Sequence, residues 1–485
     1  MKRKWIWIGL SVPVVAAAVW IWAGRDRRQT EIVIVSTNDI HGAIDRMPSL
    51  ATLVGRLRSE NEHVLLVDAG DKWTGNPYVD LCAEPGRPVV DLMNDLRYDV
   101  ATVGNHGFDN GGRELDTRIR DGRFPTVLAN LRSDSAFLRS VPPYVIETVG
   151  PVRIGFLGLT DNSRHGYPDG SPENFTGLHF SDPIPTAENY RFLADSCDIL
   201  VGLTHIGEQQ DSLLALAMPE LDLIIGGHTH TLTPEGRRIG GVLVTQAGKS
   251  LQYAGVARLY LTGGKLDSSR YELVRLDTAS PDPQIASRVE SLMRNPILEK
   301  SVGTVAADMD KVALVNFVTD AIAEATEADF AFVNWNGIRR EGHPAGEFTA
   351  ADLYATEPFA DQVEMFTMRL ADLRELLLNK FNEEGREGHV VDIYPSGGRY
   401  VIEIDGEGNG TGVRFYDRRG EPLPYDARTY RVAMSEYIGH IYDFTLRGRG
   451  RTTGVMITDM MEDYLRRHSP VTVSDAPRAG IEAQP

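Results

Sequence analysis

The sequence predicts an α/β protein with two domains, from its length and its pattern of apolar runs. The chain has 485 residues, more than one ordinary hydrophobic core accommodates, so we expect two domains. Short runs rich in Val, Ile and Leu have the length of buried strands, and helical patterns separate several of them, which is typical of a layered α/β domain. The strand-like runs are residues 32–35, 64–67, 100–103, 154–157, 199–203, 221–225 and 242–245, and the helical patterns include residues 50–57 and 89–96.

The N-terminus is predicted to be a targeting segment. Basic residues 2–4 precede an uncharged run at residues 5–23, which has tryptophans near both ends. A helix of that length would rise about 28 Å, close to the thickness of a bilayer core. We expect an uncleaved membrane anchor, with a cleaved signal peptide ending near residues 16–18 as the alternative. Either way, the body of the chain would be extracytoplasmic, in the periplasm or at the cell surface.

The same patterns give the expected domain boundaries. The anchor or signal segment takes residues 1–29, and the first domain takes residues 30–278. A linker helix at residues 279–299 leads into a second domain at residues 300–470, and residues 471–485 are expected to be a frayed tail. In the second domain the predicted helices are residues 314–325 and 456–467, and the predicted strands include residues 400–404 and 429–434.

Composition excludes some classes of protein. The formal net charge is −18, whereas a protein that follows the phosphates of a nucleic acid is usually basic, so no nucleic-acid polymer is expected as a partner. A small anionic substrate is still compatible, because bound divalent cations can invert the local field. The two cysteines, Cys82 and Cys197, are too few for a disulfide framework or a Cys-rich zinc site, and whether they pair stays open.

Polar motifs follow five of the predicted strands. They read S-T-N-D-I-H-G, V-D-A-G-D, T-V-G-N-H-G-F-D, G-L-T-H-I-G and I-I-G-G-H-T-H. In α/β folds, sites form where loops leave the carboxyl ends of the strands. Repetition of Asp, His and Asn at this one structural position therefore predicts a shared site.

The residue types in these loops indicate a metal centre. Oxygen and imidazole donors together suit Zn, Mn, Fe or Co better than Ca. They are enough for two divalent metal ions if one carboxylate bridges, and Asp71 is the candidate bridge; such a pair would lower the pKa of a shared water and clamp phosphoryl oxygens. His106 lies three residues before Asp109, which could orient the imidazole. The expected metal ligands are Asp39, His41, Asp71, Asn105, His205, His228 and His230.

The order of these motifs resembles the calcineurin-like metallophosphoesterases, and G-N-H-G-F-D and G-G-H-T-H before a second domain resemble the 5'-nucleotidase family. The resemblance implies a four-layer α/β/β/α metallophosphoesterase domain with a second, smaller α+β domain. It implies that His106 stabilises the attacked phosphoryl group or assists the leaving oxygen, and that Asp109 orients His106. The implied ligands are Asp39, His41, Asp71 and His230 for one metal, and Asp71, Asn105, His205 and His228 for the other.

The second domain is expected to select the substrate. Residues 334–339 resemble the family's Asn-x-Gly-Gly-x-Arg segment, which implies that Asn334 and Arg339 bind substrate and that the arginine holds its phosphate. Tyr437 matches the position of an aromatic side chain that stacks on a nucleobase. The sequence also departs from the family pattern: Gly107 replaces a Glu, Asn336 replaces a Gly, residues 440–444 replace a Gly-Gly-Asp-Gly run, and a first base-clamp aromatic is missing near Asp392 and Tyr394.

The predicted function is therefore that of a two-metal phosphoester hydrolase. The expected substrate is a small-molecule nucleotide, from which a 5'-nucleotidase would release phosphate. A 2',3'-cyclic nucleotide phosphodiesterase, a UDP-sugar hydrolase and a thiosulfohydrolase are alternatives within the same chemistry. A non-catalytic surface binding module is an alternative of a different class. The only other expected partner is the membrane, through the N-terminal segment.

Overall fold

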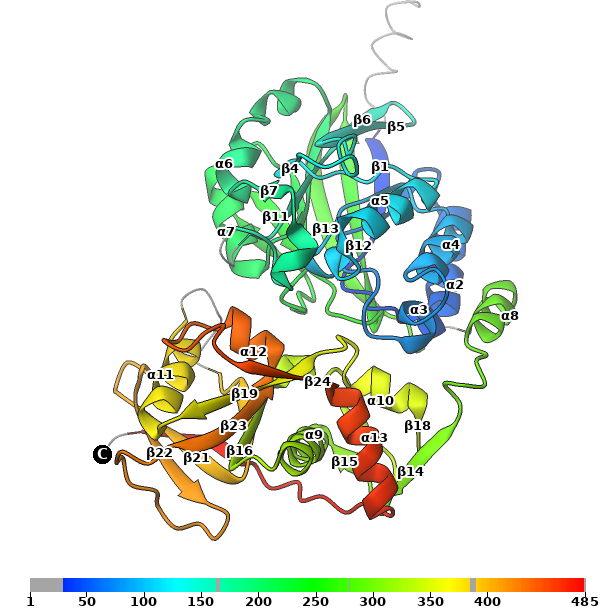
Figure 1. Ribbon diagram of the computed structural model, residues 1–485. Helices are drawn as coiled ribbons and strands as arrows, with labels where there is room; N and C mark the ends of the chain where they lie inside the picture. The colour runs from blue at the N-terminus through cyan, green and yellow to red at the C-terminus, as the bar shows by residue number, and fades with distance from the viewer. Residues whose placement is uncertain (1–28, 163–165, 279, 384–389, 484–485) are drawn as a thin grey trace, which may run out of the picture.

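The computed structural model describes residues 29–483 except for residues 163–165, 279 and 384–389 (Figure 1). The predicted anchor or signal segment lies outside the described residues. Within the described part of the chain, no helix combines the length and the apolar character that crossing a membrane requires.

Two sheets packed face to face form the centre of the first domain (Figure 1). One has the order β13-β12-β1-β2-β3 and the other the order β10-β11-β9-β8-β6-β5. The strands of the first sheet are β1 (Gln29–Thr37), β2 (Val64–Asp68), β3 (Val100–Ala101), β12 (Tyr253–Thr262) and β13 (Lys265–Arg275). Those of the second are β5 (Tyr144–Val149), β6 (Val152–Thr160), β8 (Ile199–His205), β9 (Leu223–Ile225), β10 (Arg237–Ile239) and β11 (Val242–Thr245). A short ribbon of β4 (Leu131–Ser133) and β7 (Leu178–Phe180) lies apart from both sheets.

Helices cover the outer face of each sheet, which gives the four layers. The first sheet is covered by α2 (Met47–Glu60), α4 (Arg87–Leu96) and α5 (Gly111–Asp121), and the second by α6 (Pro183–Glu188) and α7 (Glu208–Ala217). In β1, Ile32 and Ile34 pack between the sheets, whereas Val33 and Val35 pack under the helices. Both faces of the strand are thus buried, which explains why its sequence is apolar without alternation. The predicted α/β/β/α layers are confirmed.

The second domain is built on a five-stranded sheet with the order β20-β16-β23-β19-β24. Helices α9 (Lys311–Thr326) and α13 (Ile457–His468) pack on one face, and α11 (Leu370–Phe381) and α12 (Glu436–Ile441) pack on the other. The strands are β16 (Phe330–Asn334), β19 (Gln362–Met368), β20 (Ile393–Ser396), β23 (Tyr430–Ser435) and β24 (Arg451–Met456). Smaller elements are β14 (Ser301–Val305), β15 (Met309–Asp310), β17 (Gly342–His343), β18 (Gly346–Thr349) and α10 (Ala350–Thr356).

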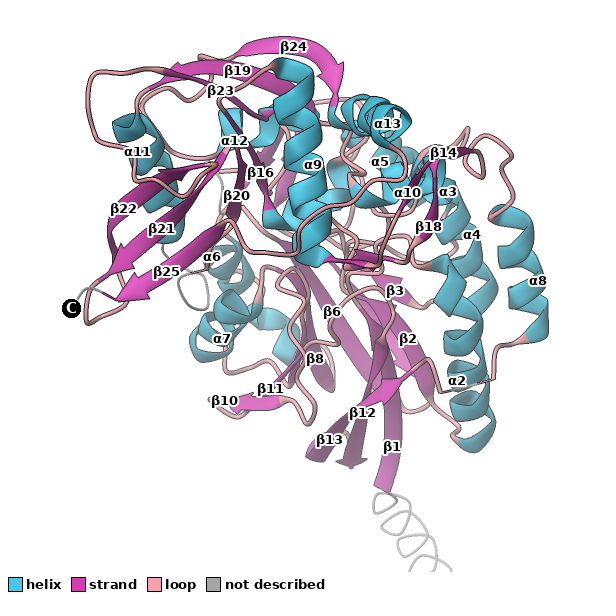
Figure 2. Ribbon diagram, turned by 90° about the horizontal axis from the view of Figure 1, so that it is seen from below, coloured by secondary structure: helices cyan, strands magenta, loops and turns pink. Residues whose placement is uncertain are grey.

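The prediction of a frayed C-terminal tail is wrong. Residues Ala479–Ala483 form β25, which pairs in parallel with β21 (Gly398–Ile404), and β21 also pairs with β22 (Gly410–Asp417). Figure 2 shows these three strands side by side at one edge of the second domain. The tail is held because the edge of β21 satisfies its backbone groups and because Arg478 makes a two-pronged ion pair with Asp320, at 2.6 and 2.7 Å.

The predicted linker helix belongs structurally to the first domain. It is α8 (Pro283–Leu292), and Asp282 caps it by accepting hydrogen bonds from two backbone N–H groups. Val289 is buried in the core of the first domain, and Arg288 lies 3.1 Å from Asp95 of α4. Figure 1 shows α8 beside α2, with the chain continuing from it into the second domain.

Candidate active site

The loops that follow five strands of the first domain bring the predicted ligands together. Every one of these side chains is at least partly buried. Asp39 and His41 follow β1, Asp71 follows β2, Asn105 follows β3, His205 ends β8, and His228 and His230 follow β9. The structure thus places all seven predicted residues at one edge of the two sheets.

Asp39, His41 and His230 form one group. His230 Nε2 lies 3.4 Å from Asp39 Oδ1 and 3.1 Å from His41 Nε2, and His41 Nε2 lies 3.7 Å from Asp39 Oδ1. Two imidazole nitrogens at this distance need a proton or a cation between them, because their lone pairs otherwise repel. This group has the donor types and the spacing to hold a metal ion.

Asp71 joins this group to its neighbours. Its Oδ2 lies 3.0 Å from His205 Nε2, which is also 3.7 Å from Asp39 Oδ1. His228 Nδ1 lies 3.0 Å from Asn105 Oδ1. Asp71 belongs with Asp39 and His205 to one group that could hold a metal ion, and with His41 and His106 to another, so its carboxylate lies where two such groups meet.

Hydrogen bonds to backbone carbonyl groups fix the orientation of two of the histidine rings. His205 Nδ1 lies 2.7 Å from the Ala69 carbonyl oxygen and His41 Nδ1 lies 3.1 Å from that of Thr74, so in each ring Nδ1 donates to the backbone and Nε2 is directed into the group. Asn38 donates to Asp39 Oδ2 at 2.7 Å. The donor set therefore fits a divalent metal.

The backbone around the ligands is strained. Non-glycine residues with positive φ are uncommon and concentrate at functional sites. Glycine is required next to them, because a Cβ at Gly104 would lie 2.2 Å from Asp71 Oδ1 and one at Gly227 would lie 2.7 Å from His205 Nδ1. Five of the seven predicted ligands have a positive φ: Asp39 (49°), His41 (47°), Asp71 (52°), His228 (83°) and His230 (58°).

The charges of the group are strongly coupled. Burial opposes ionisation of Asp39, but His230 and His205 outweigh it and hold the pKa of Asp39 below its usual range. Burial likewise opposes the charge of His205, but Asp71 and Asp39 prevail and raise the pKa of His205 to about 10. Two buried carboxylates at this site are stabilised by nearby positive charge, which a metal ion would supply.

A histidine, an aspartate and an arginine lie beside the predicted ligands. His106 Nδ1 lies 2.8 Å from Asp109 Oδ2, as predicted. Arg339, from the second domain, places one guanidinium nitrogen 3.2 Å from His106 Nε2 and 3.2 and 3.3 Å from the ring nitrogens of His41. Burial lowers the pKa of His106, but Asp109 and Asp71 reverse the effect, so its net pKa is raised.

Comparison with known proteins identifies the family. Residues 32–232 match the model of the calcineurin-like phosphoesterases, and residues 297–445 match that of the 5'-nucleotidase C-terminal domain. The chain belongs to the 5'-nucleotidase family of the calcineurin-like metallophosphoesterases. It is therefore a metal-dependent phosphoester hydrolase, as predicted.

Individual relatives of this metallophosphoesterase agree with the family. It is 28% identical to the endonuclease YhcR of Bacillus subtilis, over 73% of this chain but only 34% of that protein. It is 26% identical to a 5'-nucleotidase of Vibrio cholerae, over 93% of both chains. A 5'-nucleotidase precursor from Thermus thermophilus has the same fold, with a TM-score of 0.81 and 23% identity over 94% of this chain and 100% of that one.

The predicted substrate-binding residues of the metallophosphoesterase lie in two separate segments of the second domain. Asn334 ends β16, and Arg339 follows it across the short turn Trp335–Gly337. Tyr437, on α12, donates its hydroxyl to Asp169 Oδ1 of the first domain at 2.5 Å. Its side chain therefore lies at the boundary between the domains.

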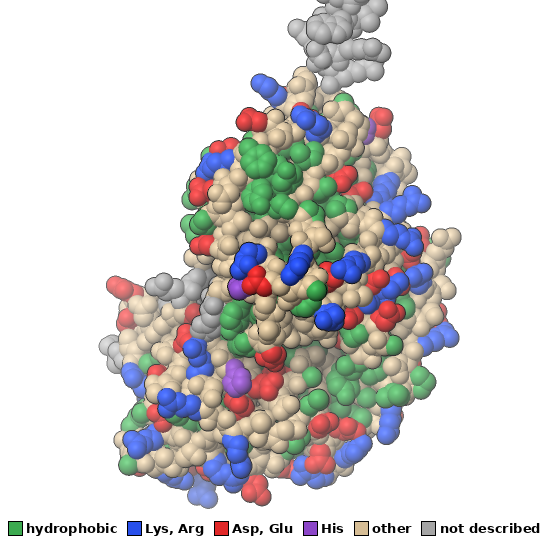
Figure 3. Space-filling model, turned by 45° about the horizontal axis from the view of Figure 1, so that its top comes forward, with side chains coloured by type: hydrophobic (Ala, Val, Ile, Leu, Met, Phe, Trp, Pro, Cys, Tyr) green, Lys and Arg blue, Asp and Glu red, His purple; other side chains and the backbone are tan. Residues whose placement is uncertain are grey.

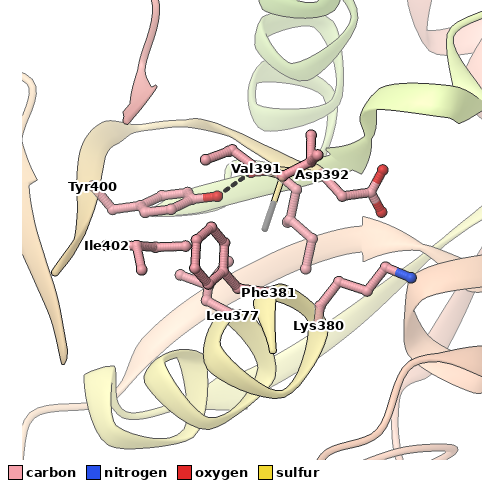
Figure 4. Close-up of a pocket in the computed structure, with 9 residues that line it drawn as sticks. Leu377, Lys380, Phe381, Val391, Asp392, Tyr400 and Ile402 are labelled. Atoms are coloured by element: carbon pink, nitrogen blue, oxygen red, sulfur yellow. Dashed lines mark hydrogen bonds between the residues drawn. The ribbon is translucent and has the colours of Figure 1, made fainter. Parts of the chain in front are cut away.

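The position of the missing base-clamp aromatic is filled differently. Asp392 is buried and accepts a hydrogen bond from the Tyr442 hydroxyl, and Figure 4 shows its carboxylate pointing away from Tyr400. The cavity in Figure 4 holds only about 10 Å³, about the minimum for one water, so it cannot receive a base. Tyr394 instead packs against Trp335, with ring centroids 4.8 Å apart.

Three residues near the site gave no signal in the sequence. Phe359 stacks on His106, and Asp169 accepts a hydrogen bond from Tyr437. Gln246 donates a hydrogen bond to the Gly227 carbonyl at 2.9 Å and so stabilises the loop that carries His228. None of them lies in a recognisable motif of a single sequence. Their roles depend on contacts between segments distant in sequence.

Proposed function

We propose that this metallophosphoesterase is a 5'-nucleotidase that releases phosphate from nucleoside monophosphates with two divalent metal ions. The observation that carries the proposal is the position of Arg339. A partly buried guanidinium from the second domain lies within 3.3 Å of His41 and His106, beside the candidate metal-binding group of the first domain. A forked cation at this point fits the oxygens of a terminal phosphate.

The proposed ligands would hold the ions in two sets that share Asp71. Asp39, His41, Asp71 and His230 form one set, and Asp71, Asn105, His205 and His228 form the other. Bound ions of Zn, Mn, Fe or Co would supply activation of a water at neutral pH and neutralise charge on the phosphoryl oxygens.

Residues outside the metal sets would handle the phosphoryl group and the leaving oxygen. Arg339 would bind and orient the phosphate. His106, whose raised pKa favours the protonated ring, would donate a hydrogen bond or a proton from Nε2. Asp109 holds the opposite nitrogen, so Nε2 faces the substrate side.

The nucleoside would bind on the second domain. Asn334 and Arg339 lie on either side of one short turn, and the aromatic ring of Tyr437 offers a surface for a base. A stacked base contributes about 1–3 kcal/mol to binding, and this contribution tolerates different bases. A panel of bases is therefore needed to define the substrate.

A polymer substrate is disfavoured although one relative is named an endonuclease. The net charge of −18 repels a polyanion, and on the face shown in Figure 3 acidic and basic side chains are interspersed. The proposed location outside the cytoplasm rests on the sequence of residues 1–29. Protease treatment of intact cells and of cells whose outer barrier alone is opened tests it: a surface domain would be digested in both, a periplasmic domain only in the second, and a cytoplasmic domain in neither.

The test of the function is phosphate release by the metal-loaded protein across a panel. The panel holds AMP, UMP, a 2',3'-cyclic nucleotide, a UDP-sugar, an aryl phosphate and single-stranded DNA. We expect the highest kcat/KM with the monophosphates. Preference for the cyclic nucleotide or the UDP-sugar would reassign the substrate, and no turnover with any metal would support a binding module instead.

A further inference from the structure

A loop of the second domain reaches the active site between α10 and β19. It comprises residues 357–361, and its only aromatic side chain, Phe359, lies against the first domain. The Phe359 ring stacks on the His106 imidazole, with centroids 5.5 Å apart and an angle of 28° between the planes. Phe359 thus covers one face of the histidine that the proposed mechanism uses.

The same ring also contacts the arginine of the site. The Arg339 guanidinium carbon lies 5.4 Å from the centre of the Phe359 ring. Arg339 and His106 are themselves 3.2 Å apart. The π face of an aromatic ring attracts a guanidinium and also stacks on an imidazole, so a single ring contacts both groups of the site.

Hydrogen bonds at both ends of the loop and one within it hold it in place. The backbone N–H of Arg339 donates to the Thr356 carbonyl at 2.9 Å, and that of Ile457 donates to the Asp361 carbonyl at 2.9 Å. Between these anchors, the Glu357 carboxylate turns inward, is 2% exposed, and accepts a hydrogen bond from the Phe359 N–H at 3.1 Å. Glu357 therefore fixes the backbone that carries the ring.

Strain in the loop indicates that this arrangement is maintained. Ala360 has a φ of 56°, a conformation that residues with a Cβ rarely adopt. Burial also raises the pKa of Glu357 well above its usual range, against the opposing backbone hydrogen bonds. The buried carboxyl group of Glu357 before Phe359 and the strained backbone of Ala360 after it both destabilise the loop. The contacts of the Phe359 ring must therefore compensate for them.

We propose that Phe359 is a positioning residue that holds His106 and Arg339 together at the reacting phosphoryl group, and that Glu357 holds Phe359. This inference rests on the proposed function of the site. It means that a side chain of the second domain, Phe359, fixes the orientation of His106 in the first domain. Without the ring, one face of His106 opens to water, and Arg339 loses a neighbour that fixes its direction.

The test compares Phe359→Leu and Phe359→Tyr in the full chain, loaded with Mn, with an aryl phosphate as substrate. This substrate carries no base, so the result is independent of nucleotide recognition. We expect Phe359→Leu to lower kcat/KM about tenfold and Phe359→Tyr, which keeps the ring, to stay within about twofold of wild type. Metal content and the melting temperature are measured for each variant.

A matched control removes a similar stack elsewhere. Phe348 stacks on His343 in the core of the second domain, with centroids 4.3 Å apart. Phe348→Leu makes the same chemical change and is expected to lower the melting temperature without the loss in kcat/KM of the folded protein. Glu357→Ala is expected to reproduce the defect of Phe359→Leu, whereas Glu357→Gln, which keeps the acceptor oxygen, is expected to restore activity.

A double-mutant cycle separates positioning from a general structural role. In a His106→Ala background, Phe359→Leu is expected to lower kcat by a smaller factor than in the wild-type background, because one of the two groups that Phe359 positions is gone. An equal loss in both backgrounds, or full activity of Phe359→Leu in the wild-type background, would overturn the inference. An inactive wild type would instead overturn the proposed function, and this inference with it.

Discussion

His106 and Asp109 form the contact most open to direct test. Replacing His106 with Ala removes the proposed acid and leaves the seven predicted metal ligands in place. We expect kcat to fall about 10²–10⁴-fold, the usual contribution of a positioned acid or base, with metal content near wild type. Metal analysis and phosphate release on the same sample check this, and an unchanged kcat would remove His106 from the proposed mechanism.

Asp211 gives a prediction about pH. It is buried, accepts a hydrogen bond from the Thr204 hydroxyl at 2.6 Å, and burial raises its pKa to about 7. The folded state therefore binds a proton that the unfolded state releases above pH about 4, and stability is lost as the pH rises through about 7. The loss is on the order of 4 kcal/mol.

Asp211→Asn mimics the protonated side chain and is expected to remove this loss. The free energy of unfolding, measured in chelator from pH 4 to pH 8, would then fall less with pH in the variant than in wild type. Identical pH profiles of the two proteins would show that Asp211 is ionised in the folded state.

At the residue scale, the sequence predicted those residues of the candidate site that lie in local motifs. Asp39, His205 and the other predicted ligands each lie at or just after the end of a strand, so the strand pattern alone predicted that they would lie together. Phe359 was not predicted, because its partners His106 and Arg339 are distant in sequence and its loop has no periodic pattern. Its place depends on how two domains meet.

At the element scale, the C-terminal strand β25 is the clearest departure from prediction. Its five residues have no alternating pattern, and Ile481 is 44% exposed, so the sequence alone did not indicate a strand. The strand forms because the edge of β21 is already present. Strands such as β2, β8 and β11 were predictable because they are buried along nearly their whole length and largely apolar, whereas β10 and β13 are exposed and polar and were not predicted.

Truncation after residue 475 tests whether β25 contributes to stability. It removes the β21 pairing and the ion pair between Arg478 and Asp320. We expect a loss of about 1–3 kcal/mol and a fall of several degrees in the melting temperature. Arg478→Ala alone should give a smaller fall, and a truncated protein that melts with wild type would show that the strand is dispensable.

At the scale of the whole molecule, the site is completed by contact between the domains. Arg339 reaches His41 and His106, Tyr437 donates to Asp169, and Lys249 pairs with Glu341 at 2.9 Å. Motifs predicted which residues each domain would offer. The relative placement of the domains is set by contacts that no single motif encodes.

Tyr437→Ala tests whether this boundary recognises the base. We expect KM for AMP to rise about tenfold, from the loss of a stacked ring, and KM for an aryl phosphate to change far less. Tyr437→Phe keeps the ring but loses the hydrogen bond to Asp169, so it separates stacking from contact between the domains. Equal effects of Tyr437→Ala on both substrates would exclude Tyr437 from the base site.

The most direct test of the central claim is a metal titration of the stripped protein, followed by phosphate release from AMP. With Mn or Zn added back, we expect activity to rise to a plateau at about two ions per chain. Asp71→Ala, which removes the shared carboxylate, should stay inactive throughout, whereas the exposed Asp45→Ala should match wild type. Full activity of the stripped protein, or a plateau at one ion per chain, would contradict a two-metal 5'-nucleotidase.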